Sequence, residues 1–372
     1  MWPWILLLSC VPGVLVFTVR LRNVRRSAPA VRPDVARFDV SIVVPARNEA
    51  HNLPTLLASL AALEPAPREI LVVDDHSTDA TAEIARAHGA HVIEPGPRPP
   101  EFLGKPWACL AGARAARGRY LLFTDADTWH APDSLARSVA LLEVTGAGLV
   151  SIVPTHRLEA LWERLQGVFQ LLLLIATRAD TRPTRTSVAR PFAIGQYLLF
   201  RRDAYEAVGG HAATPQRIAE DLALARLVSA AGFGARVLYA RGALCVRMYP
   251  EGFGAFVAGW RRNFRDGLSA AGLGAMVEMT LVVAWLLGLP LWLGQALATG
   301  RLDDALLYAL GYLATALLIA REQRGYGAFS RTSALAYPLF ALVFVWVTAV
   351  ALVDAARGRP VTWRGRTFAW VR

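Results

Sequence analysis

The sequence is poor in the residues that form covalent or metal-bound cross-links. Three cysteines, Cys10, Cys109 and Cys245, are scattered over 372 residues, and their spacing fits neither a disulfide framework nor a zinc site. Lysine is rarer still, because Lys105 is the only lysine among 40 basic residues. Since every other basic residue is an arginine, a single arginine carries little information, whereas the lysine of FLGKPWA stands out.

Charged residues are also scarce, at 19% of the chain against 54% hydrophobic residues. Three long runs contain no charge at all: Met1–Val19, Met279–Gly300 and Thr332–Val353. Because a bilayer span needs about 20 apolar residues, these runs predict a membrane protein. The net charge of +11 is spread over arginines that often flank apolar runs. Cytoplasmic membrane flanks and an anionic substrate explain this charge better than nucleic-acid binding does.

The first apolar run has the flanks of a retained anchor. Met1–Val19 has no positive segment before it and no clear cleavage site after it, and the basic sequence RLRNVRR follows at once. We therefore predict that residues 1–20 form a signal anchor rather than a cleaved signal peptide. The basic flank places the following chain in the cytoplasm.

The C-terminal third is predicted to hold two or three spans within residues 279–354. An interfacial amphipathic segment, 251–274, precedes them, and a basic tail, 355–372, follows. Ala305–Ala320 is slightly short for a perpendicular span. If all three runs span, the tail lies outside, yet its arginines favour the inside. We therefore expect Met279–Gly300, which contains Pro290, to lie in the interface or to form a re-entrant hairpin.

A further apolar segment lies in the middle of the chain. Leu158–Asp180 is interrupted near its start by Glu159, Glu163 and Arg164. This pattern fits an amphipathic helix at the membrane surface and, equally well, a core helix of the soluble domain.

Residues 38–250 have the pattern of an α/β domain. Short apolar runs alternate with helix-like stretches; the runs are Val40–Val44, Glu69–Val73, Ala90–Glu94 and Tyr120–Thr124, and the stretches are His51–Leu63, Asp79–His88 and Trp107–Arg117. Strands that alternate with helices predict βαβ units and a mainly parallel sheet. Ligands bind beyond the carboxyl ends of such strands, and three of these ends carry polar clusters: PARNE, DDHSTD and DADTWH.

The third cluster contains Asp125 and Asp127 directly after an apolar strand. In extended backbone, side chains two residues apart face the same side. Two close carboxylates raise each other's pKa unless a cation lies between them, and Mg²⁺ or Mn²⁺ favours carboxylate and phosphate oxygens. A divalent metal site is therefore one interpretation, and a surface turn is the other.

The first two clusters offer polar groups for a nucleoside. Asp74 and Asp75 have carboxylates suited to a base N–H or a ribose hydroxyl, but Asp75 or Ser77 equally suits the cap of the next helix. Glu49, beside Asn48, either binds the nucleoside or supplies a negative charge at a helix start.

Three further groups suit an anionic substrate or proton transfer. Lys105 is placed in a loop before a helix and offers a compact charge to a phosphate. Glu220 and Asp221 head an amphipathic helix, where they serve either the helix dipole or, for Asp221, as a general base. The segment GWRRNFRDG places Arg262 and Arg265 either against a departing diphosphate or, with Trp260, in a membrane-interface belt.

Taken in order, these motifs resemble the family 2 glycosyltransferases. The matching stretches are SIVVPARNE, ILVVDDHSTD, FTDADT, GQYLLFRRDAYEAVGG and AEDLALARLVSAAG. The flanking apolar runs, WRRNFR and VTWRGR are similar to the membrane-bound branch that glycosylates lipids, including ceramide glucosyltransferases and bacterial carotenoid- and hopanoid-associated enzymes. Asp266 stands where processive polysaccharide synthases of the family have tryptophan, which argues against a polymer product.

The resemblance implies an α/β GT-A fold, with a Rossmann-like, mainly parallel sheet, and N- and C-terminal transmembrane helices. It implies Asp221 as catalytic base, Asp125 and Asp127 as ligands of Mg²⁺ or Mn²⁺, and Gly195–Tyr197 as lining of the sugar or acceptor pocket. The residues expected to bind the nucleotide sugar are Pro45, Asn48, Glu49, Asp74, Asp75, Lys105, Asp125, Gly195, Gln196, Glu220, Arg262 and Arg265.

The predicted activity is inverting transfer of a sugar from a nucleotide-diphosphate sugar, with UDP favoured, to a hydroxyl or carboxyl of a lipid. The lipid class is a carotenoid, a hopanoid, or a glycerolipid or sphingolipid. The alternatives are a processive polysaccharide synthase and a non-catalytic membrane scaffold. The predicted location is the cytoplasmic membrane, multi-pass, with the catalytic domain in the cytoplasm and neither a nucleic-acid nor a protein partner predicted.

Overall fold

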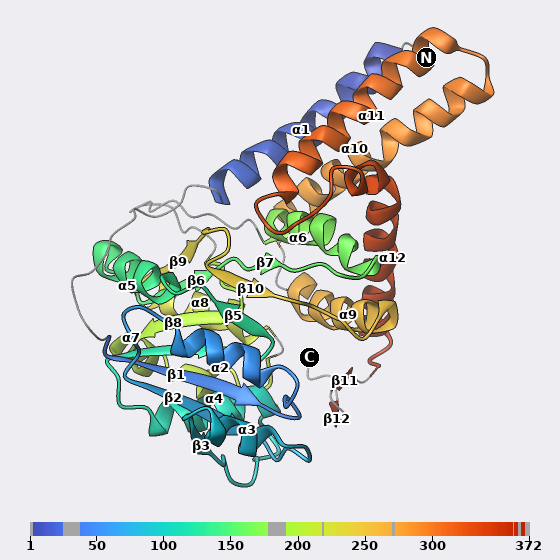
Figure 1. Ribbon diagram of the computed structural model, residues 1–372. Coiled ribbons are helices and arrows are strands. Elements are labelled where there is room, and N and C mark those ends of the chain that lie inside the picture. Colours follow the sequence, from blue (N-terminus) through green and yellow to red (C-terminus); the bar gives the residue numbers. More distant parts are fainter. Residues whose placement is uncertain are drawn as a thin grey trace. The chain divides into compact units, whose positions relative to one another are not determined.

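A computed structural model describes residues 3–24, 38–177, 191–217, 219–269, 272–359, 361–363 and 366–368 (Figure 1). The chain divides into two compact units. The first, which we call the sheet unit, comprises Val24–Thr155 and Asp180–Arg247. The second, the helical unit, comprises Met1–Asn23, His156–Ala179 and Met248–Arg372.

The sheet unit is built on seven strands in the order β3-β2-β1-β4-β8-β6-β9. Their bounds are β1 Val40–Ala46, β2 Glu69–Asp74, β3 His91–Ile93, β4 Tyr120–Thr124, β6 Leu149–Ile152, β8 Tyr197–Arg201 and β9 Ala235–Leu238. Only β8 runs against its neighbours, because its pairings with β4 and β6 are antiparallel and the other neighbouring pairs are parallel. The prediction of an α/β domain with a mainly parallel sheet is therefore confirmed.

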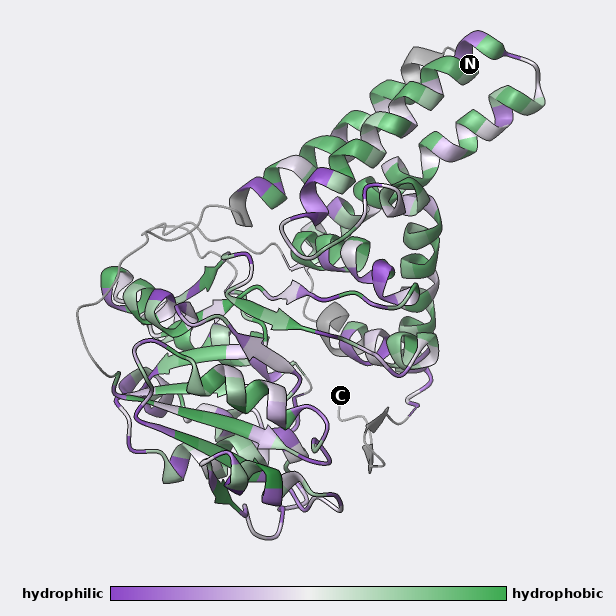
Figure 2. Cartoon of the chain, viewed as in Figure 1, coloured by the Kyte–Doolittle hydropathy of each residue, from purple (hydrophilic) through white to green (hydrophobic). Residues whose placement is uncertain are grey.

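Helices cover both faces of this sheet, which explains why the strands are continuous apolar runs (Figure 2). On one face lie α2 Leu53–Ala61, α3 Thr81–Ala87 and α5 Ser134–Thr145. On the other lie α4 Gly104–Ala115, α7 Arg202–Ala207 and α8 Glu220–Ala230. The 3-10 turn η2 Gly210–Ala213 contacts α4 and α8, and β5 Thr128–His130 pairs with β10 Leu244–Val246 beside the main sheet.

The helical unit contains the middle segment that sequence analysis left open. After β7 Thr155–His156 and the short turn η1 Trp162–Arg164, α6 Leu165–Ala176 is buried along most of its length and contacts α10, α11 and α12. Phe169 of α6 meets the rings of Phe256 and Phe344, from α9 Phe253–Ser269 and α12 Tyr337–Ala356. Leu158–Asp180 therefore supplies a core helix. This helix belongs to the helical unit, although the predicted domain 38–250 includes it.

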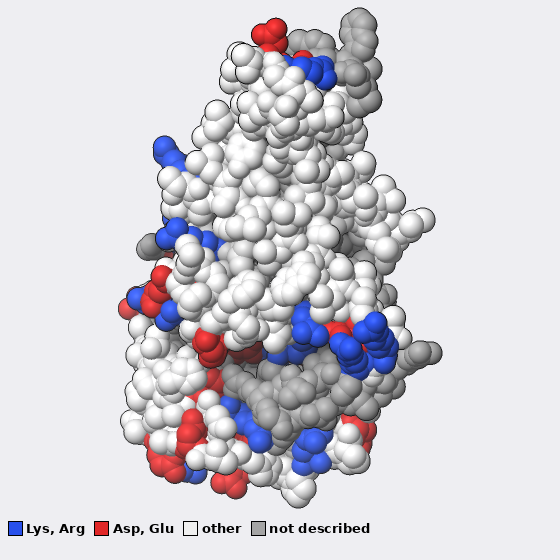
Figure 3. All heavy atoms as spheres, turned by 90° about the vertical axis from the view of Figure 1, so that its right-hand side faces the viewer, with Lys and Arg blue, Asp and Glu red and all other residues white. Residues whose placement is uncertain are grey.

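Within the described residues of this unit, three helices have the length and composition to cross a membrane: Leu273–Ala298 (α10), Leu302–Gln323 (α11) and Ser333–Ala356 (η3 with α12). Each exposes large apolar side chains, for example Leu291, Leu317 and Leu342. The face drawn in Figure 3 shows few charged side chains along these helices. Such a surface indicates membrane association.

Pro290 does not break α10, which runs unbroken over 26 residues. The expectation of a re-entrant hairpin over Met279–Gly300 is therefore wrong, and α11, at 22 residues, is not too short to span. Helix α9 lies within the predicted amphipathic segment 251–274, and the tail holds the antiparallel strands β11 Val361–Trp363 and β12 Arg366–Phe368. The side of the membrane on which the tail lies stays a prediction.

The N-terminal helix α1, Pro3–Val24, packs along α10 in antiparallel fashion. Gly13 lies so close to Leu281 that an added Cβ would be 2.5 Å from its carbonyl oxygen, and Phe17 packs edge-on against Trp285. Nearer its end, Arg20 pairs with Glu278. Its other side exposes Leu8, Val11, Leu15 and Val19. These features are compatible with an N-terminal anchor, which stays a prediction.

Packing between α4 and the sheet gives a first test of this fold. An added Cβ on Gly112 of α4 would lie 2.3 Å from Val43 Cγ1 and 2.9 Å from Val73 Cγ2. Gly112→Ala should therefore lower the free energy of unfolding by about 1–3 kcal/mol through overpacking. The measurement is denaturant unfolding of the detergent-solubilised protein, with Gly254→Ala as control, because Gly254 has open space around it in α9. Equal stability of the two variants would contradict this packing.

Candidate active site

The register of four strands brings the polar loops to one edge of the sheet. Ala46 is the register partner of Asp74, so the ends of the parallel strands β1 and β2 are level. Thr124, the last residue of β4, is opposite Tyr197, the first residue of β8. Since β8 is antiparallel, the turn that precedes it, Gly195–Gln196, lies beside the residues that follow β4. This edge therefore carries DADT, VDDHST and the GQ turn together, as the resemblance implied.

Lys105 is the centre of the charged cluster at this edge. Its Nζ lies 2.8 Å from Asp125 Oδ1, 2.9 Å from Glu220 Oε1 and 3.5 Å from the Gly195 carbonyl oxygen. Burial alone would lower the pKa of Lys105, but the carboxylates of Asp125 and Glu220 outweigh it and hold this pKa well above its usual value. Lys105 is therefore a fixed positive charge. It lies in the first turn of α4, so its expected placement in a loop before the helix is wrong.

Asp221 is held by backbone amides on both of its oxygens. Gly195 N donates to Oδ2 and Leu222 N donates to Oδ1, each at 2.7 Å. Burial, followed by the negative charge of Glu220, raises the pKa of Asp221 to about 7, although Lys105 and the two amides oppose this rise. A carboxylate with a pKa near neutrality suits a general base, because it is basic and yet ionised over much of the physiological range.

Gly195 lies close to the side chains of Lys105, Asp221 and Glu220. A Cβ there would be 3.2 Å from Lys105 Nζ, 3.3 Å from Asp221 Oδ2 and 3.4 Å from Glu220 Oε1. The absence of a side chain therefore lets the backbone approach the cluster. Gln196 is fixed next to it, because its carbonyl accepts a hydrogen bond from Thr124 Oγ1 at 2.9 Å.

Tyr197 does not line a pocket as expected. It is fully buried, and its hydroxyl is bonded to Ser138 in the core of the sheet unit.

Asp125 and Asp127 lie in a turn, so the assumption of extended backbone was wrong. The Asp125 carbonyl accepts from Thr128 N at 3.4 Å and from Thr128 Oγ1 at 2.8 Å, and this closes the turn between β4 and β5. Among the residues that the structure describes, no three His, Cys, Asp or Glu side chains form a metal-binding group. Two carboxylates one residue apart nonetheless fit the oxygen preference of Mg²⁺ or Mn²⁺, which often take one or two carboxylates together with phosphate oxygens.

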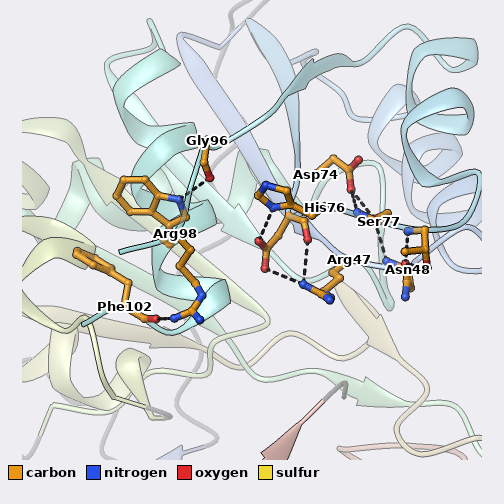
Figure 4. Close-up of polar contacts among 11 residues, drawn as sticks. Arg47, Asn48, Asp74, His76, Ser77, Gly96, Arg98 and Phe102 are labelled. Carbon is orange, nitrogen blue, oxygen red and sulfur yellow. Dashed lines mark hydrogen bonds and ion pairs between the residues drawn. The ribbon is translucent and has the colours of Figure 1, made fainter. Parts of the chain in front are cut away.

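The loops after β1 and β2 are cross-linked by polar contacts (Figure 4). Asn48 Oδ1 accepts from Thr78 N at 2.8 Å, and Asn48 N donates to Ser77 Oγ at 3.0 Å. Asp74 Oδ1 accepts from Ser77 N at 3.1 Å. Asn48 and Asp74 therefore shape this edge, whatever they contact in a ligand.

Asp75 is almost fully buried and lies against two basic side chains. His76 Nδ1 lies 3.3 Å from its Oδ1, and Arg47 Nη1 lies 3.3 Å from its carbonyl oxygen and 3.9 Å from its Oδ2 (Figure 4). Sequence analysis assigned no role to Arg47, although it lies inside PARNE. The sequence pattern that could have revealed Arg47 is its position directly after the apolar strand β1, next to the acidic end of β2.

Asp75 or Ser77 was one candidate for the cap of α3, but neither caps this helix. Asp79 Oδ1 instead accepts a hydrogen bond from Thr81 N, at 3.1 Å.

The remaining predicted residues have mainly structural contacts. Pro45 lies within β1 opposite Val73. Glu49 Oε2 accepts from Asn52 Nδ2 at 2.7 Å just before α2, which favours the helix-start interpretation. Arg262 and Arg265 belong to α9 of the helical unit, and the side chain of Arg265 lies outside the described residues. Trp260 of the same helix is buried and donates to Gln166 Oε1 at 3.1 Å, so it does not form an interface belt.

The chain is similar in sequence and in fold to known glycosyltransferases. Residues 41–209 match the model of the family described as Glycosyl transferase family 2. The chain is similar to the 4,4'-diaponeurosporenoate glycosyltransferase of Staphylococcus aureus strain USA300, with 27% identity over 98% of this chain and 96% of that protein. The same enzyme of strain N315 is 28% identical over 89% and 88%.

Among solved structures, the fold is similar to that of a mannosyltransferase from Pyrobaculum calidifontis in complex with GDP-Man and Mn²⁺. The TM-score is 0.56 at 21% sequence identity, over 92% of this chain and 96% of that one. This likeness, together with the mixed but mainly parallel sheet, identifies the GT-A fold.

Removal of the central cation should destabilise the sheet unit. Lys105→Met leaves the buried Glu220 and the partly exposed Asp125 without their cation, so the free energy of unfolding should fall by about 3 kcal/mol. Adding Glu220→Gln to that variant should recover part of the loss, because one uncompensated buried carboxylate is removed. Denaturant unfolding of the four proteins of this cycle measures the coupling. If the effects of Lys105→Met and Glu220→Gln on the free energy of unfolding simply add, a direct interaction between Lys105 and Glu220 is contradicted.

Proposed function

Because residues 41–209 form a family 2 glycosyltransferase domain, we propose that this chain transfers a sugar from a nucleotide-diphosphate sugar to a membrane lipid. The observation that carries the proposal is the pair of ion pairs that Lys105 forms with Asp125 and with Glu220, the residue directly before Asp221. It joins carboxylates suited to a metal diphosphate with a carboxylate suited to proton transfer. UDP is the favoured nucleotide, on the family resemblance alone.

Asp221 acts as the general base of a single displacement. An acceptor hydroxyl gives its proton to Asp221 while its oxygen attacks the anomeric carbon, and the bond from that carbon to the diphosphate oxygen breaks. One displacement inverts the configuration. Lys105 supplies fixed positive charge near the leaving group. A divalent cation held by Asp125 and Asp127 supplies further charge for the diphosphate when bound.

The apolar helices that flank the sheet unit in the sequence favour a lipid as the acceptor. Three apolar helices follow this unit, and α1 exposes a further apolar stripe. The Staphylococcus aureus relatives, similar over nearly the whole chain, act on a carotenoid acid by their name. A carotenoid-type acceptor with a hydroxyl or carboxyl group is therefore the first candidate, with hopanoids, glycerolipids and sphingolipids next. The enzyme is multi-pass in the cytoplasmic membrane, with its sheet unit in the cytoplasm.

The two acceptor groups place different demands on Asp221. A hydroxyl must lose its proton during attack, whereas a carboxylic acid is already ionised near pH 7. The raised pKa of Asp221 suits the first case. A strong dependence on Asp221 therefore favours a hydroxyl acceptor, and a weak dependence favours a carboxylate acceptor.

Substitution of the two aspartates tests the chemistry. Asp221→Asn should lower kcat about 10²- to 10⁴-fold on a hydroxyl acceptor, because the base is lost while the shape is kept. Asp127→Asn should abolish the metal-stimulated part of the activity. Glu206→Gln is the matched control, since Glu206 is an exposed acid of α7 whose side chain pairs with Arg202. Full activity of both aspartate variants would refute the assignment.

Substrate identity needs a direct experiment. Membranes that contain the protein should be incubated with a panel of nucleotide sugars, Mg²⁺ or Mn²⁺ and lipid extract, and the lipids analysed by mass spectrometry. We expect one or a few sugars on a lipid, and loss of the product on chelation of the metal. A polymer would instead support a polysaccharide synthase, and binding of nucleotide sugar without any product would support a non-catalytic scaffold.

A further inference from the structure

Glu220 takes no part in the bond-making and bond-breaking steps of the proposed reaction, yet it is one of the most buried acids of the sheet unit. Only 4% of its surface is exposed, and its Oε1 lies 2.9 Å from Lys105 Nζ. It precedes Asp221 at the start of α8. Helix-dipole stabilisation alone does not require such burial, because that interaction works at exposed positions.

The geometry around Lys105 suits an ammonium group, which forms ion pairs with Asp125 and Glu220 and a hydrogen bond to the Gly195 carbonyl oxygen. Three oxygens converge on its Nζ, one each from Asp125, Glu220 and the Gly195 backbone. A lysine ammonium has three N–H donors at one point, whereas the planar fork of arginine spreads its donors. This convergence gives a physical reason for a single lysine in a chain whose other basic residues are all arginine.

We propose that Glu220 is a positioning residue, which holds Lys105 against Asp125 and the Gly195 backbone, so that Glu220 and Lys105 together tune the catalytic base Asp221 through the Gly195 turn. Gly195 completes the connection, because its carbonyl faces Lys105 while its amide holds Asp221 Oδ2. Glu220 would keep its pair with Lys105 if Asp125 helped to hold a metal diphosphate. The inference rests on the proposed function, since it concerns the base of that reaction.

The charges around Asp221 give the expected direction of each effect. Glu220 on α8 raises its pKa, and Lys105 on α4 lowers it. Further titratable groups near Lys105, among the residues that the structure describes, are Asp125 after β4, whose charge is paired with Lys105, and Cys109 and His211. Burial raises the pKa of Cys109 and lowers that of His211 to about 3, so both are neutral near pH 7. Glu220 and Lys105 are therefore the two charges that decide the balance.

The test is the pH dependence of kcat at saturating donor. Activity should rise with pH as Asp221 loses its proton, near pH 7 in the wild type. Glu220→Gln removes a negative charge and should move this limb down by about one pH unit or more. Lys105→Met removes a positive charge and should move it up. Lys105→Arg keeps the charge and should leave the limb near its wild-type position, with a higher donor KM because the fork fits three converging oxygens poorly.

Donor hydrolysis serves as a second assay, because water there replaces the lipid hydroxyl and needs the same base. Opposite shifts for Glu220→Gln and Lys105→Met support the inference, since a merely structural role would lower activity at every pH. Shifts in the same direction, or an unmoved limb in Glu220→Gln, would overturn it while leaving the proposed function intact. If Lys105→Met does not fold, Glu220→Gln and Lys105→Arg decide. A wild-type protein that transfers sugar to no acceptor would refute the proposed function itself.

Discussion

The balance of charge around Lys105 is the constraint on which the sheet unit depends. Asp125, Glu220 and Asp221 come from two distant parts of the chain, and each carries a negative charge when ionised. Three carboxylates at one edge repel one another unless cations lie between them. Lys105 supplies one positive charge, so the cluster keeps an excess of negative charge. That excess is what a divalent cation would neutralise, and it explains why the edge suits a metal diphosphate better than a neutral ligand.

The sheet makes this crowding possible by its topology. The parallel strands β1, β2 and β4 deliver their following loops to one edge, and the reversed strand β8 delivers the turn that precedes it to the same place. The starts of α4 and α8, on the same face of the sheet, add Lys105 and Glu220. One reversed strand therefore lets a backbone turn, Gly195–Gln196, enter a site otherwise made of strand-end loops.

Sequence reasoning found the parts of this site that obey local rules. The four N-terminal strands and three helices followed from alternating apolar runs, and their ends marked Asn48, Asp74, Asp75 and Asp125. The sequence analysis did not predict β6, β8 and β9. These strands are short, and the sequence around them shows no clear alternation of strand and helix from which their direction or order follows. The contact of Lys105 with Glu220 joins residues 115 positions apart by number, 220 minus 105, and no local pattern encodes such a pair.

The helical unit illustrates a different limit. Apolar composition located α10, α11 and α12, yet the same composition in α6 belongs to a helix buried by protein. Apolar composition shows that a segment is more stable away from water, but either protein or lipid can surround it. What separates the cases is the outer surface: α6 is enclosed, whereas α10 to α12 keep leucines exposed along their length. An enzyme whose acceptor is apolar gains from this arrangement, because the acceptor and the exposed leucines would share the same lipid environment.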